Sequence, residues 1–260
     1  MKRSFLIILI VLPMVCFALS AEENSYPTDY LLSYPATIYT EATAPLNWQK
    51  ANWLQASVII LTAGSLYFLD DELRELYQRN RTEFTDNIFT GAKQCGEVKI
   101  VLPALAITTL GGYLAQNEKI TDTGLLCLKS SVLALSVTQI LKMASQRQRP
   151  LKDQGEQFWN GSKFSFHNDS FPSGHSTLVW SIAPIIAEAN QPIKWIPPTV
   201  YVMATLTSLS RLNDDQHWTS DVFTGAVIGY VTAKLTLKTT PHWQLSYYQQ
   251  GQGVSVLYRF

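Results

Sequence analysis

The sequence predicts an all-α fold, a six-helix bundle, with a C-terminal β-hairpin. Apolar residues make up 47% of the 260-residue chain and charged residues only 15%, below the roughly 25% of an ordinary soluble domain. Six apolar segments are each long enough for a helix rather than a strand, whereas the C-terminal residues alternate between apolar and polar. Basic and acidic residues both number 20, so the charge balance indicates no nucleic-acid partner.

The first 20 residues are typical of a secretory signal peptide. Lys2 and Arg3 precede an apolar run over residues 5–19, and residues 18–20 form a small-x-small cleavage site. The run is short for a membrane span, so an uncleaved anchor is only the alternative. We therefore expect export. Outside the cytoplasm both a Cys95–Cys127 disulfide and two buried thiols are compatible with the sequence.

The remaining elements follow in chain order. Residues 21–50 are polar and contain three prolines, which predicts an extended lead-in. The helical domain covers residues 51–238, and the polar stretch at 70–81 is expected to continue its first helix. Residues 239–260 predict the hairpin, because alternating apolar residues flank a Gln-Gly-Gln-Gly turn. The six apolar segments of the helical domain lie at about 53–69, 100–115, 124–142, 174–188, 195–209 and 219–236.

Two polar motifs surround the predicted third and fourth helices. In KMASQRQRP (142–150), Lys142 and Arg149 are close to two helical turns apart and lie on one face. Pro150 ends that helix, so the two cations converge at its end. In SFPSGH (170–175), His175 follows a Pro-Ser-Gly turn at the start of a helix. A solvated basic helix end and ordinary capping chemistry are the alternative interpretations.

A third motif, SRLNDDQHWTSD (210–221), pairs a histidine with a carboxylate. His217 and Asp221 are four residues apart and therefore neighbours on a helix. A carboxylate beside a ring N–H fixes the tautomer and stabilises the imidazolium. Arg211 precedes this pair across a short polar connection that is able to fold back. An exposed ion pair on one helical turn is the alternative.

In this order and at these spacings, the motifs Lys-x6-Arg-Pro, Pro-Ser-Gly-His and Ser-Arg-x5-His-x3-Asp resemble the tripartite signature of the type 2 phosphatidic acid phosphatase superfamily. That superfamily includes bacterial class A non-specific acid phosphatases and vanadium-dependent haloperoxidases. The resemblance implies the helical bundle of the acid phosphatase type and a phosphatase without metal or other cofactor. It implies that His217, held by Asp221, attacks phosphorus to form a phosphohistidine, and that His175 protonates the leaving oxygen.

The residue types suit phosphoryl transfer, which requires positioned cations and N–H donors around the phosphoryl oxygens. The two arginines are able to bind oxygens in bidentate fashion, and a helix N-terminus favours an anion. Gly174 carries no side chain, so a phosphate can approach the backbone closely. The candidate phosphate-binding residues are Lys142, Arg149, Ser173, Gly174 and Arg211.

The substrate class stays open between phosphorylated small molecules and lipid phosphates or pyrophosphates. A phosphotransferase acting on a lipid or sugar acceptor and a haloperoxidase are the alternative functions. Five aromatic residues between the first two motifs predict either an apolar lip for a lipid or a loop held by its own apolar residues; they are Phe158, Trp159, Phe164, Phe166 and Phe171. His167 and His242 are interpreted as surface residues.

We expect an extracytoplasmic, periplasmic enzyme that is soluble or membrane-associated. Most of the apolar segments are shorter than the ~20 residues that a membrane span needs, so an integral membrane protein is the alternative. The sequence leaves the oligomeric state open.

Overall fold

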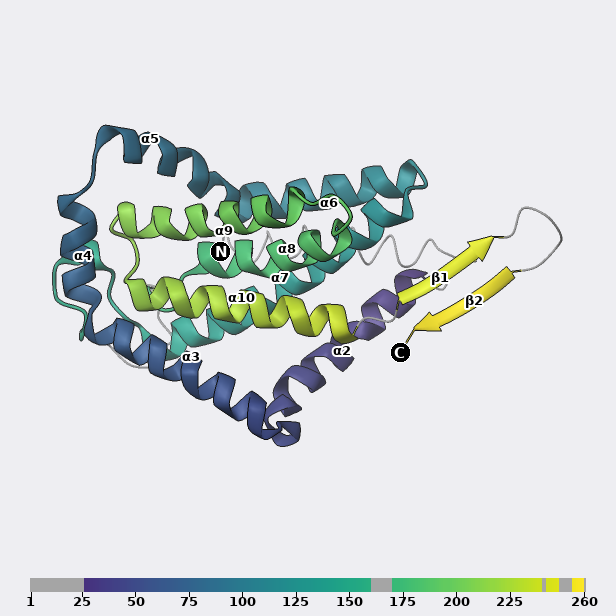
Figure 1. Cartoon of the computed structure of the whole chain (residues 1–260), viewed down its shortest axis with the longest axis horizontal. Coiled ribbons are helices and arrows are strands. Elements are labelled where there is room, and N and C mark those ends of the chain that lie inside the picture. The colour runs from purple at the N-terminus through teal and green to yellow at the C-terminus, as the bar shows by residue number, and fades with distance from the viewer. Residues whose placement is uncertain (1–25, 160–169, 240–241, 248–253, 260) are drawn as a thin grey trace. The chain divides into compact units, whose positions relative to one another are not determined.

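The computed structural model describes residues 26–159, 170–239, 242–247 and 254–259 (Figure 1). The chain divides into two compact units, Met1–Thr43 with Lys238–Phe260, and Ala44–Leu237. The predicted signal peptide lies outside the described residues.

The smaller unit contains helix α2 (Tyr26–Thr43) and two antiparallel strands, β1 (His242–Tyr247) and β2 (Val254–Arg259). The predicted extended lead-in is therefore wrong over most of its length. Pro27 lies in the first turn of α2, where a missing N–H is tolerated. Beyond Pro35, the Thr37 hydroxyl donates to the Ser33 carbonyl at 3.0 Å, and it lies 2.7 Å from the Thr239 hydroxyl.

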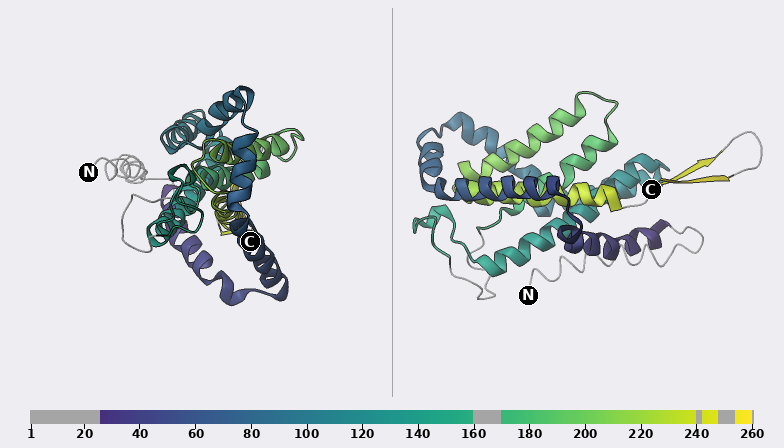
Figure 2. Two further views of the ribbon diagram at one scale, coloured as in Figure 1. Left: turned by 90° about the vertical axis from the view of Figure 1, so that its left-hand side faces the viewer. Right: turned by 60° about the horizontal axis from the view of Figure 1, so that its bottom comes forward.

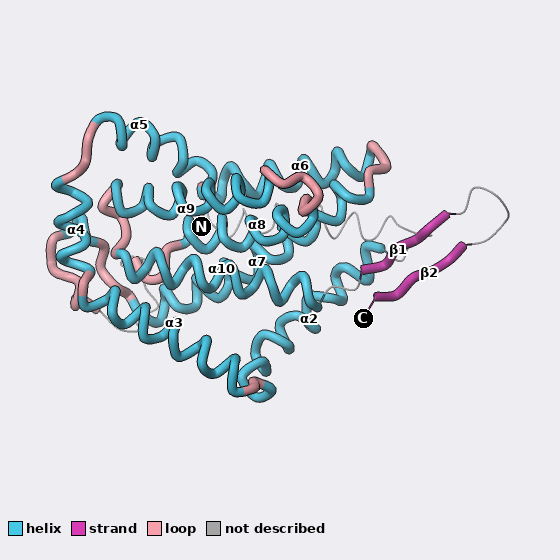
Figure 3. Tube along the Cα trace, viewed as in Figure 1, coloured by secondary structure: helices cyan, strands magenta, loops and turns pink. Residues whose placement is uncertain are grey.

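The described residues of the larger unit form helices joined by turns and loops (Figure 3). Three short 3-10 helices connect longer elements, at Ala44–Asn47, Lys93–Gly96 and Pro150–Lys152. The α-helices are α3 (Lys50–Phe68), α4 (Asp70–Arg79), α5 (Glu83–Ala92), α6 (Val98–Leu114), α7 (Glu118–Ser145), α8 (Gly174–Ala189), α9 (Ile196–Asn213) and α10 (Thr219–Thr239).

The predicted fold class, a six-helix bundle with a C-terminal β-hairpin, is wrong as a whole. The described residues form nine α-helices, and the two C-terminal strands belong to the unit of α2 and not to that of the bundle. Residues 70–81 do not continue the first helix, because the chain leaves the helical conformation at Leu69 and α4 is bent by 63° from α3. Helix α5 has no apolar segment of its own; a capping box between Thr82 and Thr85 begins it.

The core of the larger unit lies between α7, α8, α9 and α10, which run alongside one another with α4 near one end (Figures 1 and 2). Helix α8 is central, because Val179 and Ala183 pack against Ala204 of α9. Ile185 packs against apolar residues of α7 and α10. A Cβ atom on Gly225 of α10 would lie 2.5 Å from the Ser173 carbonyl oxygen. The missing side chain therefore allows α10 to approach the N-terminus of α8 closely.

Much of the apolar surface of this unit faces outward. No residue of α3 is buried, and large side chains such as Ile60 on α3 and Ile107 on α6 are 69% and 72% exposed. By length and composition, α7 qualifies as a membrane span; if each bent pair, α3 with α4 and α5 with α6, counts as one span, the described residues hold up to three.

Candidate active site

The predicted site residues gather at one end of the helical unit. The end of α7, the start of α8, the end of α9 and the start of α10 meet there, joined by the turn before α6. Lys142 of α7 approaches Gly174, the first residue of α8, and its Nζ donates to the Ser170 carbonyl at 3.4 Å. The backbone N–H of Ser173 donates to the Asp221 carbonyl at 3.0 Å. The structure thus brings residues from all three motifs together.

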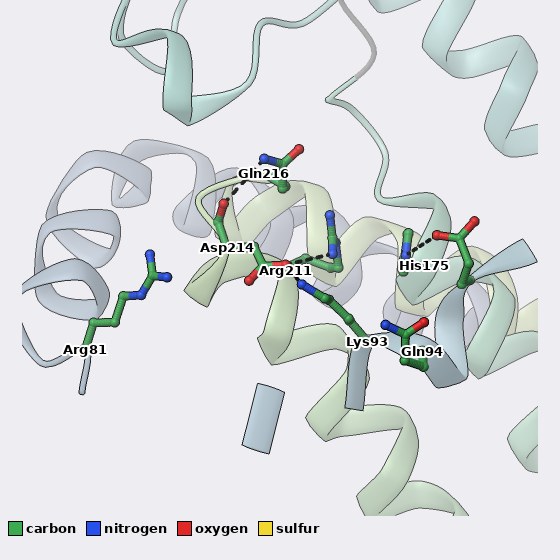
Figure 4. A pocket seen from close by; sticks show the side chains of 8 residues that line it. Arg81, Lys93, Gln94, His175, Arg211, Asp214 and Gln216 are labelled. Carbon is green, nitrogen blue, oxygen red and sulfur yellow. Dashed lines mark hydrogen bonds and ion pairs between the residues drawn. The ribbon is translucent and has the colours of Figure 1, made fainter. Parts of the chain in front are cut away.

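A polar pocket of about 350 Å³ opens at this end of the unit (Figure 4). His175 and Arg211 line it, and Arg211 pairs with Asp214 at 3.2 Å. The guanidinium of Arg149 donates to the side chain of Gln216, which also lines the pocket. The remaining lining residues, none of which belongs to a motif position, are Arg81, Lys93, Gln94 and Glu97.

Two buried donors in this region lack a hydrogen-bond partner among the described residues, the Ser173 hydroxyl and Nε of Arg211. Buried polar groups are ordinarily hydrogen-bonded, so an unpaired hydroxyl at the start of α8 and an unpaired guanidinium nitrogen near the end of α9 fit a bound anion. The space beside Gly174 is open, since an added Cβ would meet nothing closer than the Lys142 side chain at 4.0 Å. Side-chain cations, a hydroxyl and backbone N–H groups could together hold a tetrahedral oxyanion.

Both histidines have depressed pKa values. Burial lowers the pKa of His175 to about 3, helped by the positive charge of Arg211 and of further cations nearby. Burial also lowers the pKa of His217 to about 4, against the opposing influence of Asp221. Nδ1 of His217 lies 3.8 Å from Oδ2 of Asp221, longer than a hydrogen bond, and has no partner among the described residues. Without a bound anion, both rings are neutral at pH 7.

Sequence reasoning missed the group that holds Asp221. Arg147 donates from Nη1 to Oδ1 of Asp221 at 2.7 Å and from Nη2 to Oδ2 of Asp70 at 2.8 Å. All three side chains are 0% exposed. The guanidinium also lies 5.0 Å from the ring centroids of Tyr67 and Trp159. The signal for Arg147 was its place as a further cation within the first motif; Asp70, on α4, had no signal.

Asp221 has little freedom to move. Besides the Arg147 contact, its Oδ2 accepts the backbone N–H of Trp218 at 3.0 Å and the hydroxyl of Ser170. Although burial raises the pKa of Asp221, its interactions with His217 and Arg147 hold that pKa below the usual range. The carboxylate is therefore ionised and fixed beside His217.

The remaining candidates from the sequence are the two cysteines, possible metal ligands, and the other aromatic residues and histidines. Cys95 and Cys127 are free thiols, one exposed and one buried. Among the described residues no cluster of His, Cys, Asp or Glu is placed to hold a metal ion. Phe158 is exposed. Phe164, Phe166 and His167 lie outside the described residues, as does the side chain of His242.

Trp159 and Phe171, two of the predicted lip residues, line a second pocket of about 430 Å³. Their ring centroids are 5.5 Å apart. Most of the other lining residues are apolar. Those from α3 and α10 are Ile59, Ile60, Ala63, Tyr67, Ser220, Phe223, Thr224, Val227 and Ile228, and Arg147 completes the lining.

Comparison with known proteins shows similarity to lipid phosphate phosphatases. The chain is 24% identical over 255 residues to the lipid A 1-phosphatase of Porphyromonas gingivalis, covering 90% of this chain and 50% of that protein. It thus spans about half the length of the curated relative it matches. A crystal structure of a transmembrane PAP2-type phosphatidylglycerolphosphate phosphatase from Bacillus subtilis has a TM-score of 0.55 at 21% identity, covering 70% of this chain and 94% of that one.

The structure of LpxE from Aquifex aeolicus gives a TM-score of 0.49 at 24% identity, covering 65% of this chain and 95% of that one. Residues 124–244, which contain all three motifs, match the model of the PAP2 superfamily. The family model therefore matches the part of the chain that carries all three motifs, and it confirms the resemblance to the type 2 phosphatidic acid phosphatase (PAP2) superfamily noted from them.

Proposed function

We propose that this chain is a membrane-associated phosphatase that hydrolyses a lipid phosphate through a phosphohistidine intermediate, without a metal ion, outside the cytoplasm. The observation that carries the proposal is the set of unpaired buried donors, Ser173 Oγ and Arg211 Nε, beside two histidines and several cations. Such a site is built to hold an oxyanion against a nucleophile. Export by the predicted signal peptide is part of the proposal.

The mechanism follows from the positions of the two histidines and Asp221. His217 turns Nδ1 towards Asp221, which leaves Nε2 to attack phosphorus. A bond from nitrogen to phosphorus forms as the bond from phosphorus to the leaving oxygen breaks, and protonated His175 gives its proton to that oxygen. His175, now neutral, accepts a proton from water, and the resulting hydroxide displaces His217 and releases phosphate.

The cations serve the transition state. Charge on the three equatorial oxygens of the transferring phosphoryl group needs compensation in any phosphoryl transfer. Lys142 at the end of α7, Arg149 after it and Arg211 near the end of α9 supply positive charge, and a guanidinium is able to bind two oxygens at once. This arrangement supplies from side chains the charge that bound magnesium supplies in other phosphoryl-transfer enzymes.

Two features of the chain support a lipid substrate. Many large apolar side chains on α3 and α6 are exposed, which is typical of a surface that meets a membrane or a partner, and α7 is long and apolar enough to cross a bilayer. The relative from Porphyromonas gingivalis is named for a lipid substrate. A chain anchored in a membrane would meet lipid phosphates at the headgroup level, where an exposed polar pocket is accessible.

The proposal is tested with protein purified in detergent. Phosphate release is measured from a long-chain alkyl phosphate in mixed micelles and from glycerol 2-phosphate, each with and without EDTA. We expect faster release from the alkyl phosphate, no effect of EDTA, and an acid-labile phosphoenzyme. His217→Ala should abolish both phosphoenzyme and turnover, while His175→Ala should lower turnover by about 10²–10⁴-fold. His242→Ala is the control. Full turnover of His217→Ala would refute the mechanism.

A further inference from the structure

The turn before α6 forms a wall of the polar pocket, although it lies outside the residues that match the family. Its 3-10 helix, Lys93–Gly96, packs directly on His175. A Cβ atom on Gly96 would lie 3.0 Å from both Cβ and Cδ2 of His175 and 2.7 Å from Cγ2 of Thr207. The turn therefore holds the His175 ring from one side, and only glycine at position 96 leaves room for it.

The next residue, Glu97, lies beside the same ring. Its Oε2 lies 3.6 Å from Nε2 of His175, within ion-pair distance. The two side chains are 39% and 23% exposed, so the pair lies at the pocket wall rather than in open solvent. A carboxylate at this distance favours the protonated form of an imidazole.

The other charges that act on His175 are mostly positive. They come from every neighbouring element: Arg211 on α9, Lys142 on α7, Arg149 after α7, and His217 before α10 if it is protonated. Lys93 also lines the pocket. Asp214, the other carboxylate of the pocket, pairs with Lys93 at 3.3 Å and with Arg211 at 3.2 Å.

We propose that Glu97 is a positioning residue for His175, which keeps the ring oriented and stabilises the proton that the ring delivers to the leaving oxygen. This inference rests on the proposed function, because it assigns Glu97 to the acid step of that mechanism. Burial and the surrounding cations depress the pKa of His175, so the ring needs a source of negative charge to be an acid near neutral pH.

The proton transfer balances without a further reactant. Phosphate binding neutralises part of the cationic field, and His175 takes a proton from solvent while Glu97 stays ionised. As the leaving oxygen separates from phosphorus, His175 donates that proton to it and becomes neutral. Glu97 exchanges no proton with the substrate, and its carboxylate, beside an anion site, is expected to weaken phosphate binding slightly.

The leaving group provides the first test. Glu97→Gln keeps the shape of the side chain and removes its charge. Because p-nitrophenolate leaves without much protonation whereas an alkoxide does not, the variant should lose about tenfold or more in kcat on a long-chain alkyl phosphate and little on p-nitrophenyl phosphate. Its KM should not rise, and Glu97→Asp should recover part of kcat. Glu118→Gln, at the exposed start of α7, is the matched control.

The pH dependence of activity is a second test, and the role of Glu97 sets the direction in which it should move. A protonated His175 is required, so activity is lost as pH rises through its pKa, and removal of Glu97 should move this basic limb to lower pH. An equal loss on both substrates, or a basic limb that does not move, would overturn the inference. His217→Ala, measured beside it, separates this result from failure of the proposed function, since that failure would leave His217→Ala active.

A second measurement does not depend on turnover. The chain has four histidines, so a ring-labelled sample allows the His175 signal to be assigned by its loss in His175→Asn and titrated by NMR. We expect Glu97→Gln to titrate His175 at a lower pH than wild type, and Glu118→Gln to leave the titration unchanged. An unchanged His175 titration in Glu97→Gln contradicts the proposal even if the enzyme proves inactive on both substrates.

Discussion

Removal of Arg147 should cost more stability than removal of any other cation in the site. Its guanidinium binds Asp70 and Asp221 at 2.8 and 2.7 Å, with all three side chains buried. Breaking one buried pair by removing one partner costs about 3–5 kcal/mol, and Arg147→Met leaves two carboxylates unpaired, which places the cost near about 5 kcal/mol. At about 2–4 °C per kcal/mol for a domain of this size, the unfolding temperature should fall by about 10–20 °C.

The assay is thermal unfolding in detergent at pH 7, followed by tryptophan fluorescence, because Trp159 and Trp218 lie 5.0 and 5.2 Å from the Arg147 guanidinium. Arg149→Met is the matched control: it should lose phosphate release with less loss of stability, since Arg149 is only partly buried and donates to the neutral side chain of Gln216. Adding Asp70→Asn to Arg147→Met should recover part of the stability. A shift below about 4 °C, equivalent to about 1 kcal/mol, would refute the reasoning.

Three further outcomes are expected. Ser173→Ala should leave the unfolding temperature unchanged, because no described residue pairs with that hydroxyl, yet weaken inhibition by vanadate about tenfold or more; unchanged inhibition would argue against an anion there. Gly225→Ala should cost about 1–3 kcal/mol, measured by thermal unfolding, whereas Gly91→Ala, with nothing within 4 Å, should not. The pKa values of His175 and His217 in the folded chain are about 3 and 4, below the value of about 6.5 for histidine in an unfolded chain. The unfolded chain therefore binds more protons between pH 6.5 and 4, so the free energy of unfolding should fall as the pH drops through that range. A free energy of unfolding that stays constant there would contradict this.

The sequence predicted those helices whose apolar faces are long. The segments at 174–188, 195–209 and 219–236 correspond closely to α8, α9 and α10, because their apolar residues form the core. Helices α2, α4 and α5 have no such signal. In α5 the Thr82 capping box was readable, but in α4 the polar sequence alone did not show that the chain turns at Leu69. These three helices lack the long apolar run that indicated the other helices in the sequence.

The sequence also predicted only some of the residues of the candidate site. Residues proposed to touch phosphate were predictable, because they stand in three short motifs whose residue types and spacings resemble a family signature. Residues that hold them were not: Asp70 reaches Ser220 across 150 positions of sequence, and Glu97 reaches His175 from outside the matched family region. Such contacts exist only after the helices have packed. A chain that kept all three motifs but carried neutral residues at positions 70 and 97 would therefore still match the family, while its Asp221 and His175 would have lost part of what orients them.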